Sequence, residues 1–280
     1  MRKGLWIVLA LAVGIFMIST AAFAAPSGLV NGQLNGGTGI TGTFHDLSST
    51  TGVGGQWVGN TTSTGTNNRI CIFCHAPHNT KGPNSGTGYT YLPLWNHELS
   101  TVSTYQTFST GTAQVGSPDA NDPNNTTDGI KLQANIGQPG AVSKLCLSCH
   151  DGSVAVSAYG MNAADSYLHS PDGTAGTKMT GTSNGIKQIG AGGDLSNHHP
   201  IGFNYNDAQS KDQEIAQSTT TLSSASGVRV KDVLIDGKME CITCHDVHNS
   251  KNESGAEKFL WKSDTHSRFC LTCHLKGAIN

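Results

Sequence analysis

Apolar and polar positions along the chain form one strong hydrophobic run at the start and little periodicity after it. The run fills residues 5–18, follows two basic residues and leads into small residues that end at Ala24. A basic start, an apolar middle and an A-x-A end are typical of a cleaved secretory signal peptide. Because a bilayer span needs about 20 apolar residues, the run is short for a membrane anchor. We therefore expect residues 1–24 to be cleaved and residues 25–280 to form one exported domain.

The rest of the chain predicts little regular structure. Segments 27–68, 109–140 and 171–228 are rich in turn-forming residues and show no sustained period of 3.6 or 2. We expect them to be loops, in a mostly irregular fold with short helices and few strands. Loops on this scale ordinarily indicate disorder, unless something other than apolar side chains supplies the buried surface. A large bound cofactor would supply it.

Composition agrees with a poor side-chain core and narrows the partners. Only 13% of the residues are charged, where about 25% is usual. Without residues 1–24 the chain has 15 basic and 19 acidic residues, and the basic ones form no stripe or long run. Nucleic acid is therefore not an expected partner, and an anionic membrane surface is not indicated.

The cysteines carry the main chemical signal. All eight occur as C-x-x-C pairs, and each pair is followed directly by histidine: "CIFCH" at 71–75, "CLSCH" at 146–150, "CITCH" at 241–245 and "CLTCH" at 270–274. An exported chain often oxidises paired cysteines to disulfides, and C-x-x-C pairs can form a zinc ribbon. Neither alternative requires a histidine after every pair.

Covalent haem attachment does require it. Two thiols three residues apart lie one helical turn from each other, so both can add to the vinyl groups on one porphyrin edge, and C-x-x-C-H is the signature of c-type haem. The sequence thus predicts four haem c groups with four proximal iron ligands. The attachment cysteines are Cys71, Cys74, Cys146, Cys149, Cys241, Cys244, Cys270 and Cys273, and the proximal ligands are His75, His150, His245 and His274.

Eight further histidines could supply the second axial ligands. "CIFCHAPH" and "CITCHDVH" share the spacing C-x-x-C-H-x-x-H. A histidine one helical turn past the proximal ligand lies on the same side of that haem, so we expect His78 and His248 to bind a neighbouring haem. His199 precedes a proline, which favours an extended backbone, and is our third distal ligand, with His198 beside the haem.

The fourth distal ligand is less specified by the sequence. We favour His45, which lies in a polar turn near the mature N-terminus and could serve its own subunit or a neighbouring one; the other candidates are His97, His169, His198 and His266. After residue 24 only Met161, Met179 and Met239 remain, too few for four irons. Bis-histidine ligation follows, with reduction potentials below those of a Met-ligated cytochrome.

These motifs resemble the multihaem c-type cytochromes with a doubled C-x-x-C-H motif, found in metal-reducing bacteria and archaea. The shared landmarks are "FHDLSS" at 44–49, "CIFCHAPHN" at 71–79, "PLWN" at 93–96, "KLCLSCHDGSVA" at 144–155, "LSNHHPIGF" at 195–203, "CITCHDVHN" at 241–249 and "FCLTCH" at 269–274. Within that family the chain is most similar to the tetrahaem OmcE type, whose subunits polymerise into extracellular filaments.

The resemblance implies that His45, His78, His199 and His248 are the distal ligands. It also implies a subunit wrapped around a chain of four haems, and it allows one histidine to be donated across the subunit boundary. We therefore expect an electron-transfer protein that forms a homopolymer, receives electrons from periplasmic or outer-membrane cytochromes, and passes them to an extracellular acceptor.

Two other functions remain open on the sequence. A multihaem reductase needs an iron with a vacant position, yet the spare histidines exceed the irons two to one. A monomeric periplasmic shuttle would use the same haems, but such shuttles usually dock through a charged patch, and the sparse charge here argues against one. The shuttle is the stronger alternative.

Overall fold

The structure is a computed structural model that describes the chain in separate segments. These are residues 29–30, 33–34, 39–47, 70–78, 94–107, 135–156, 158–159, 178–179, 188–224 and 226–275. The expected signal peptide at 1–24 and the candidate ligand His169 lie outside them. Within the described residues, no helix has the length and apolar character needed to cross a membrane.

Helices in the described residues are short. The α-helices are α1 (Ala141–His150), α2 (Tyr205–Lys211), α3 (Cys241–Cys244) and α4 (Cys270–Cys273), and the 3-10 turns are η2 (Ile70–Phe73), η4 (Ala191–Gly193), η5 (Val230–Asp232) and η6 (Thr265–Ser267). Helices α1, α3 and α4 each contain a C-x-x-C pair, and η2 contains Cys71 and ends one residue before Cys74. The longest helix, α1, thus ends on a haem-attachment motif.

Within the described residues the strands form three separate antiparallel pairs and no extended sheet. They are β1 (Leu29–Val30) with β2 (Gln33–Leu34), β3 (Phe203–Asn204) with β6 (Lys238–Met239), and β4 (Thr221–Ser223) with β5 (Val228–Arg229). In the second pair Phe203 lies opposite Met239, and the third has an irregular register. Two-stranded pairs of this size are not stable alone, so they depend on packing against the rest of the chain.

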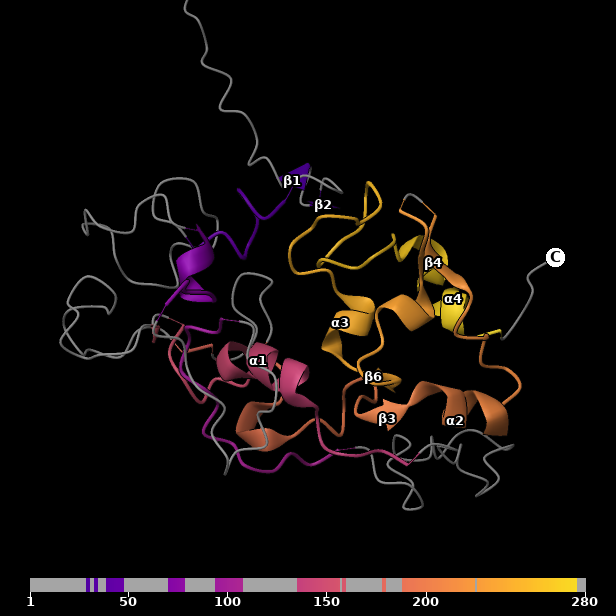
Figure 1. Cartoon of the computed structure of the whole chain (residues 1–280), viewed down its shortest axis with the longest axis horizontal. Coiled ribbons are helices and arrows are strands. Elements are labelled where there is room, and N and C mark those ends of the chain that lie inside the picture. The colour runs from indigo at the N-terminus through magenta and orange to yellow at the C-terminus, as the bar shows by residue number, and fades with distance from the viewer. Residues whose placement is uncertain are drawn as a thin grey trace, which may run out of the picture.

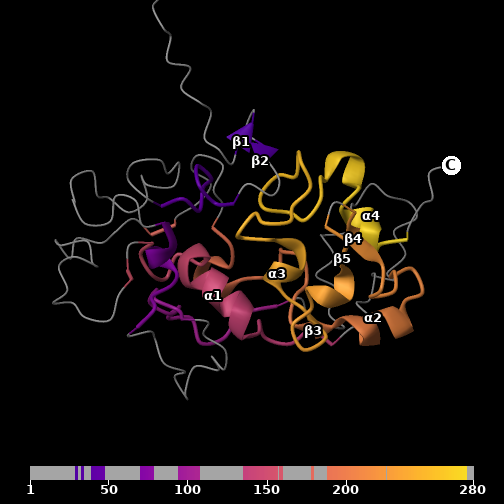
Figure 2. The ribbon, with the colours of Figure 1, turned by 45° about the horizontal axis from the view of Figure 1, so that its top comes forward.

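The four motif elements follow one another across the molecule in chain order. Figures 1 and 2 show η2, α1, α3 and α4 from one side to the other. The two middle elements are joined directly, since the Cys241 amide at the start of α3 donates to Ser143 Oγ of α1 at 2.9 Å. The fold therefore places the attachment motifs in one row.

Apolar packing is concentrated at the C-terminal end of that row. The largest buried cluster consists of Phe203, Tyr205, Ala208, Leu222, Val228, Val230, Val233, Met239 and Trp261. Around the first two motifs the buried clusters contain only two or three residues each, such as Phe73 with Tyr159 and Trp95 with Leu145. A core this divided agrees with the poor side-chain core expected from composition.

The expectation of a loop throughout 171–228 is wrong at β4 and at residues 203–211, and the loop expected at 27–68 contains β1 and β2. Residues 203–211 form β3 and then α2. Helix α2 forms there because Asn204 Oδ1 accepts from the Asp207 amide at 2.9 Å, a side-chain N-cap. Tyr205 and Ala208, three residues apart, bury one face, while Lys211 pairs with Asp207 at 2.9 Å on the other. The helix has two turns, too few to produce a sustained sequence period.

Candidate haem-binding site

Each C-x-x-C-H motif closes one helical turn, as the spacing predicts. The histidine amide donates to the carbonyl of the first cysteine in three motifs: His75 to Cys71 at 2.8 Å, His245 to Cys241 at 3.1 Å and His274 to Cys270 at 2.9 Å. The second motif is the last turn of α1. In every motif the two thiols therefore stand one turn apart on a common backbone frame.

A second element holds three of the proximal histidines. After the turn the chain becomes extended, and the histidine forms a single antiparallel bridge with a distant residue: His75 with Trp95, His245 with Leu260 and His274 with Ile215. Residues on either side exchange backbone hydrogen bonds, for example Ala76 N to Leu94 O at 2.9 Å and Asn96 N to Cys74 O at 2.8 Å. We call residues 94–96, 214–216 and 259–261 the bridge segments.

The bridge segments were not predicted from the sequence to contact the proximal histidines, although segment 94–96 lies within the landmark "PLWN" at 93–96. In two of them a side chain also reaches the motif: Asn96 Nδ2 donates to Ile72 O at 2.5 Å, and Trp261 Nε1 donates to Ile242 O at 3.1 Å. Both acceptors are the isoleucine of a C-I-x-C turn. That shared isoleucine and the landmark "PLWN" are local signals of these segments. A one-residue bridge is too short to give the alternation of apolar and polar residues that marks a strand.

Three pairs of histidine rings face each other, and each pair joins one proximal histidine to one expected distal histidine. The ring centroids are 6.1 Å apart for His75 and His248, 6.2 Å for His45 and His150, and 6.3 Å for His199 and His274. A metal–imidazole bond is about 2 Å long and the ring centre lies about 1 Å behind the nitrogen, so two imidazoles on opposite sides of one iron have centroids roughly 6 Å apart. The residues present thus fit bis-histidine haem.

Hydrogen bonds orient two of the expected ligand imidazoles, those of His245 and His199. Nδ1 of His245 lies 2.7 Å from the Lys258 carbonyl, and Nδ1 of His199 lies 2.9 Å from the Pro200 carbonyl. A ring that donates from Nδ1 to a carbonyl keeps Nε2 unprotonated, which is the form a metal binds. Both rings are therefore held in a ligating tautomer.

His45 is positioned by a ring contact instead. Its imidazole stacks on Phe259, with centroids 4.5 Å apart and planes 20° from parallel, so the third motif's bridge segment orients the second motif's expected ligand. Burial, followed by the nearby His150, lowers the pKa of His45 to about 3. The ring is neutral at physiological pH, as a ligand must be.

The remaining expected ligand, His78, is not brought next to the remaining proximal histidine, His245. The His78 side chain is exposed, and neither ring makes a ring contact with another imidazole among the residues described. The assignment of His78 to an iron stays a prediction.

The alternative ligands occupy other environments. His97 is buried and both its ring nitrogens face carbonyls, Nδ1 that of Glu98 at 2.7 Å and Nε2 that of Ala155 at 3.0 Å, which occupies both nitrogens. His266 is exposed in η6 with a φ of 56°. His198 is half-buried, and none of the described imidazoles makes a ring contact with it.

The attachment cysteines of neighbouring motifs are close to one another. Burial and then the Cys74 thiol raise the pKa of Cys149, and a hydrogen bond with Cys241 is the main cause that raises the pKa of Cys146. Burial and then Cys273 raise the pKa of Cys244 to about 12. The thiols of motifs one and two, two and three, and three and four are thus successive neighbours.

All eight cysteines are unbridged thiols in this fold. Among the residues described, no group of three or more His, Cys, Asp or Glu side chains is arranged to hold a bare metal ion.

Comparison with known proteins bears on the third and fourth motifs. Residues 235–278 match the family described as the doubled CXXCH motif. The chain contains a doubled CXXCH unit. This unit supports a multihaem c-type cytochrome with covalently bound haem c, and it suggests electron transfer rather than catalysis. No curated protein matches the chain.

Buried aspartates next to haem-site histidines are a second feature missed from the sequence. Asp46, Asp151 and Asp246 follow His45, His150 and His245 directly, and all three are buried. Within the doubled CXXCH unit Asp246 accepts from the amides of Ser250 at 2.8 Å, Lys251 at 3.0 Å and His248 at 3.2 Å. The repeated His-Asp dipeptide is the sequence signal for these buried aspartates. In the third motif the carboxylate stabilises the turn that carries the expected ligand His248.

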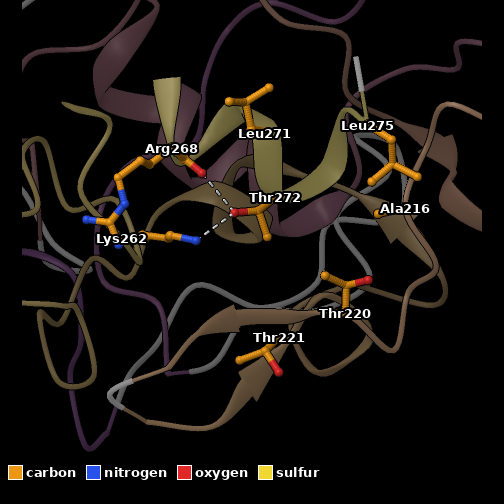
Figure 3. Close-up of a pocket in the computed structure, with 8 residues that line it drawn as sticks. All are labelled: Ala216, Thr220, Thr221, Lys262, Arg268, Leu271, Thr272 and Leu275. Carbon is orange, nitrogen blue, oxygen red and sulfur yellow. Dashed lines mark hydrogen bonds between the residues drawn. The ribbon is translucent and has the colours of Figure 1, made fainter. Parts of the chain in front are cut away.

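The far end of the doubled CXXCH unit borders a shallow hollow of about 360 Å³ (Figure 3). Its lining consists of Ala216, Thr220, Thr221, Lys262, Arg268, Leu271, Thr272 and Leu275. Lys262 Nζ donates to Thr272 Oγ1 at 3.1 Å, and this hydroxyl donates to the Arg268 carbonyl at 3.1 Å. Leu271 and Leu275 on its rim are exposed, so an apolar surface lies beside the fourth motif.

Proposed function

We propose that the chain is a tetrahaem electron-transfer protein that assembles into an extracellular filament. Upstream periplasmic or outer-membrane cytochromes would reduce it, and an external acceptor would oxidise it. The observation that carries the proposal is the set of three histidine pairs, because each supplies two imidazoles at the spacing that one iron requires.

The residues of the chain would act as a scaffold. The cysteines would fix each haem covalently, and the bridge segments would hold the proximal histidines. The buried aspartates would stabilise the turns that carry the histidine ligands. When bound, haem c supplies one-electron chemistry at its iron. Two imidazoles at one iron favour electron transfer over substrate reduction, which needs a vacant position.

Assembly is the finer part of the proposal. Three large apolar side chains in the described residues are markedly exposed, Leu94 beside the first motif and Leu271 and Leu275 beside the fourth. They lie toward opposite ends of the row of motifs, so a second copy of the chain is the partner that would cover both surfaces. A contact at these ends would place the first motif of one copy next to the fourth motif of another.

The decisive experiment is electron microscopy of haem-stained material sheared from cells that express the protein together with a cytochrome-maturation system. Filaments whose density fits four haems per subunit would support the full proposal. Monodisperse tetrahaem particles recovered from the periplasm would overturn the filament and favour the monomeric shuttle. A loading of other than four haems, measured by pyridine haemochrome against protein mass, would contradict the haem count.

A further inference from the structure

Trp95 has a buried hydrogen-bond donor without an acceptor in the part of the chain that the structure describes. Its side chain is 8% exposed, and its indole Nε1 makes no hydrogen bond there. Leaving such a group unsatisfied destabilises the fold, and buried donors in native proteins almost always have an acceptor. An acceptor is therefore expected at this position.

The surroundings of Trp95 indicate where that acceptor belongs. The indole stands nearly perpendicular to the imidazole of His75, with centroids 6.1 Å apart and an angle of 87°. It also packs with Leu145 of α1 and with Cys74. The side chain thus lies between the first and second attachment motifs, against the proximal ligand of the first.

The backbone leaves Trp95 little freedom to move away. The bridge with His75 is closed on both sides, by Ala76 N to Leu94 O at 2.9 Å and by Asn96 N to Cys74 O at 2.8 Å. The donor is consequently held next to the haem-attachment motif rather than at a surface where water could satisfy it.

We propose that the Trp95 indole N–H donates a hydrogen bond to a propionate of the haem attached at Cys71 and Cys74. The periphery of a porphyrin is hydrocarbon apart from its two propionates, so these carboxylates are the acceptors that the group offers to a side-chain donor. A charge-assisted bond of this kind is stronger than a neutral one. The inference rests on haem attachment as proposed above and is independent of filament assembly.

Trp95 would then be a positioning residue that also tunes one iron. A donor to the propionate offsets part of its negative charge, and removing the donor leaves more negative charge near the iron, which favours the ferric state. In the haem-loaded W95F variant, one of the four reduction waves should move to lower potential while the other three stay in place. The resonance Raman band of propionate bending should shift as well.

Trp261 provides a matched control. It is 9% exposed and lies in the corresponding bridge segment of the third motif, but its Nε1 already donates to the Ile242 carbonyl. W261F should lower stability without shifting the propionate band. To assign the shifted reduction wave to a haem, W95F is combined with H248A, which removes the expected second ligand of the first motif's iron. The wave shifted by W95F must belong to the haem that H248A converts to high-spin.

Unchanged potentials and an unchanged propionate band in W95F would overturn the proposal, as would a shift assigned to another haem. If W95F does not accumulate with its haems, the wild-type protein still decides. The ultraviolet resonance Raman marker of indole N–H hydrogen bonding, measured with Trp95 selectively labelled, should indicate a strong bond to an anionic acceptor. A marker typical of a free or weakly bonded indole would refute it. Absence of any haem spectrum would instead refute haem attachment itself.

Discussion

The imidazole of His75 lies 6.1 Å from that of His248, with the two ring planes 30° apart. The first residue belongs to the first attachment motif, and the second follows the third motif by one turn. The contact therefore brings together two segments that are far apart in the sequence. It also fits the expectation that the second histidine of C-x-x-C-H-x-x-H serves a different haem from the first.

This pairing makes His248 a direct test of the ligand assignment. H248A should leave one of four haems with a single axial imidazole, which converts that iron from low-spin to high-spin. The measurement is electron paramagnetic resonance of the oxidised holoprotein, with the high-spin signal quantified against total haem. H266A is the control, since His266 is exposed in η6. Four low-spin haems in H248A would disprove the pair.

His45 and His97 separate a ligand from a structural histidine. H45A should produce one high-spin haem, because His45 faces His150 at 6.2 Å. H97A should keep four low-spin haems but lower stability, since it removes contacts to the carbonyls of Glu98 and Ala155 worth about 0.5–1.5 kcal/mol each. Electron paramagnetic resonance and denaturant titration distinguish the two. High-spin iron in H97A and not in H45A would reverse the assignment.

The sequence predicts the covalent part of the site better than its three-dimensional pairing. Attachment of haem through C-x-x-C-H is a local property of one turn, so Cys241 and His245 could be identified from spacing alone. The partner of His75 is His248 from a distant segment, and no local pattern specifies which iron a distal histidine reaches. His45 illustrates the same limit, because its orientation depends on stacking against Phe259.

The fold follows a similar division. Low charge and frequent turn residues predict an irregular chain with a small core, and the described residues contain short helices and few strands. Helix α2 escapes prediction because one Asn204 cap and a single buried face stabilise only two turns. The bridge segments are not predicted, because a pairing such as His274 with Ile215 involves one residue on each side. So short a pairing produces no alternation of apolar and polar residues in the sequence.

Glu240 should set the stability of the junction between the second and third motifs. Its buried carboxylate accepts from the Gly140 amide at 3.1 Å and from the Ser143 hydroxyl, so it joins the N-termini of α1 and α3. E240A should cost about 1–3 kcal/mol. G140A should also destabilise, because a Cβ there would lie 2.6 Å from Glu240 Oε1. Denaturant titration of the holoproteins measures both changes.

The same carboxylate predicts a pH dependence of unfolding. Burial raises the pKa of Glu240 above its ordinary value, against the hydrogen bonds from Ser143 and Gly140 and the charge of Lys238. The folded state therefore holds the proton more tightly than the unfolded state. The contribution of Glu240 protonation to the free energy of unfolding is complete below about pH 4.3 and is lost as pH rises through the raised pKa. E240Q should flatten that part of the profile; an unchanged profile would contradict the prediction.

Leu271 and Leu275 should be required for assembly and not for haem binding. Both are exposed on the rim of the hollow beside the fourth motif. Lysine at both positions places two charges in the expected contact between copies, so L271K/L275K should abolish filaments while retaining the full haem content. S210K on exposed α2 is the control for an added charge. Filaments of normal length in the double variant would exclude this surface as the contact.

His78 decides how the fourth iron obtains its second ligand. Each C-x-x-C-H-x-x-H segment offers one proximal and one distal imidazole, and the first half of a reciprocal exchange is formed by His75 and His248. The remaining imidazoles are His245, whose Nδ1 is bonded to Lys258 O at 2.7 Å, and the exposed His78. We therefore expect His78 to complete the exchange, from the same chain or from a neighbouring subunit.

The two sources differ in their dependence on assembly. If His78 acts within its own chain, the dilute monomer has four low-spin haems, and H78A converts one of them to high-spin at any concentration. If it acts across the subunit boundary, the wild-type monomer already has one high-spin haem, which becomes low-spin in filaments. When monomers of H78A are mixed with those of H245A, low-spin ligation is restored only at contacts between the two variants. Magnetic circular dichroism before and after assembly distinguishes these results. Four low-spin haems in H78A, both as monomer and as filament, would contradict the reciprocal exchange, because the iron at His245 would then take its second ligand from another residue.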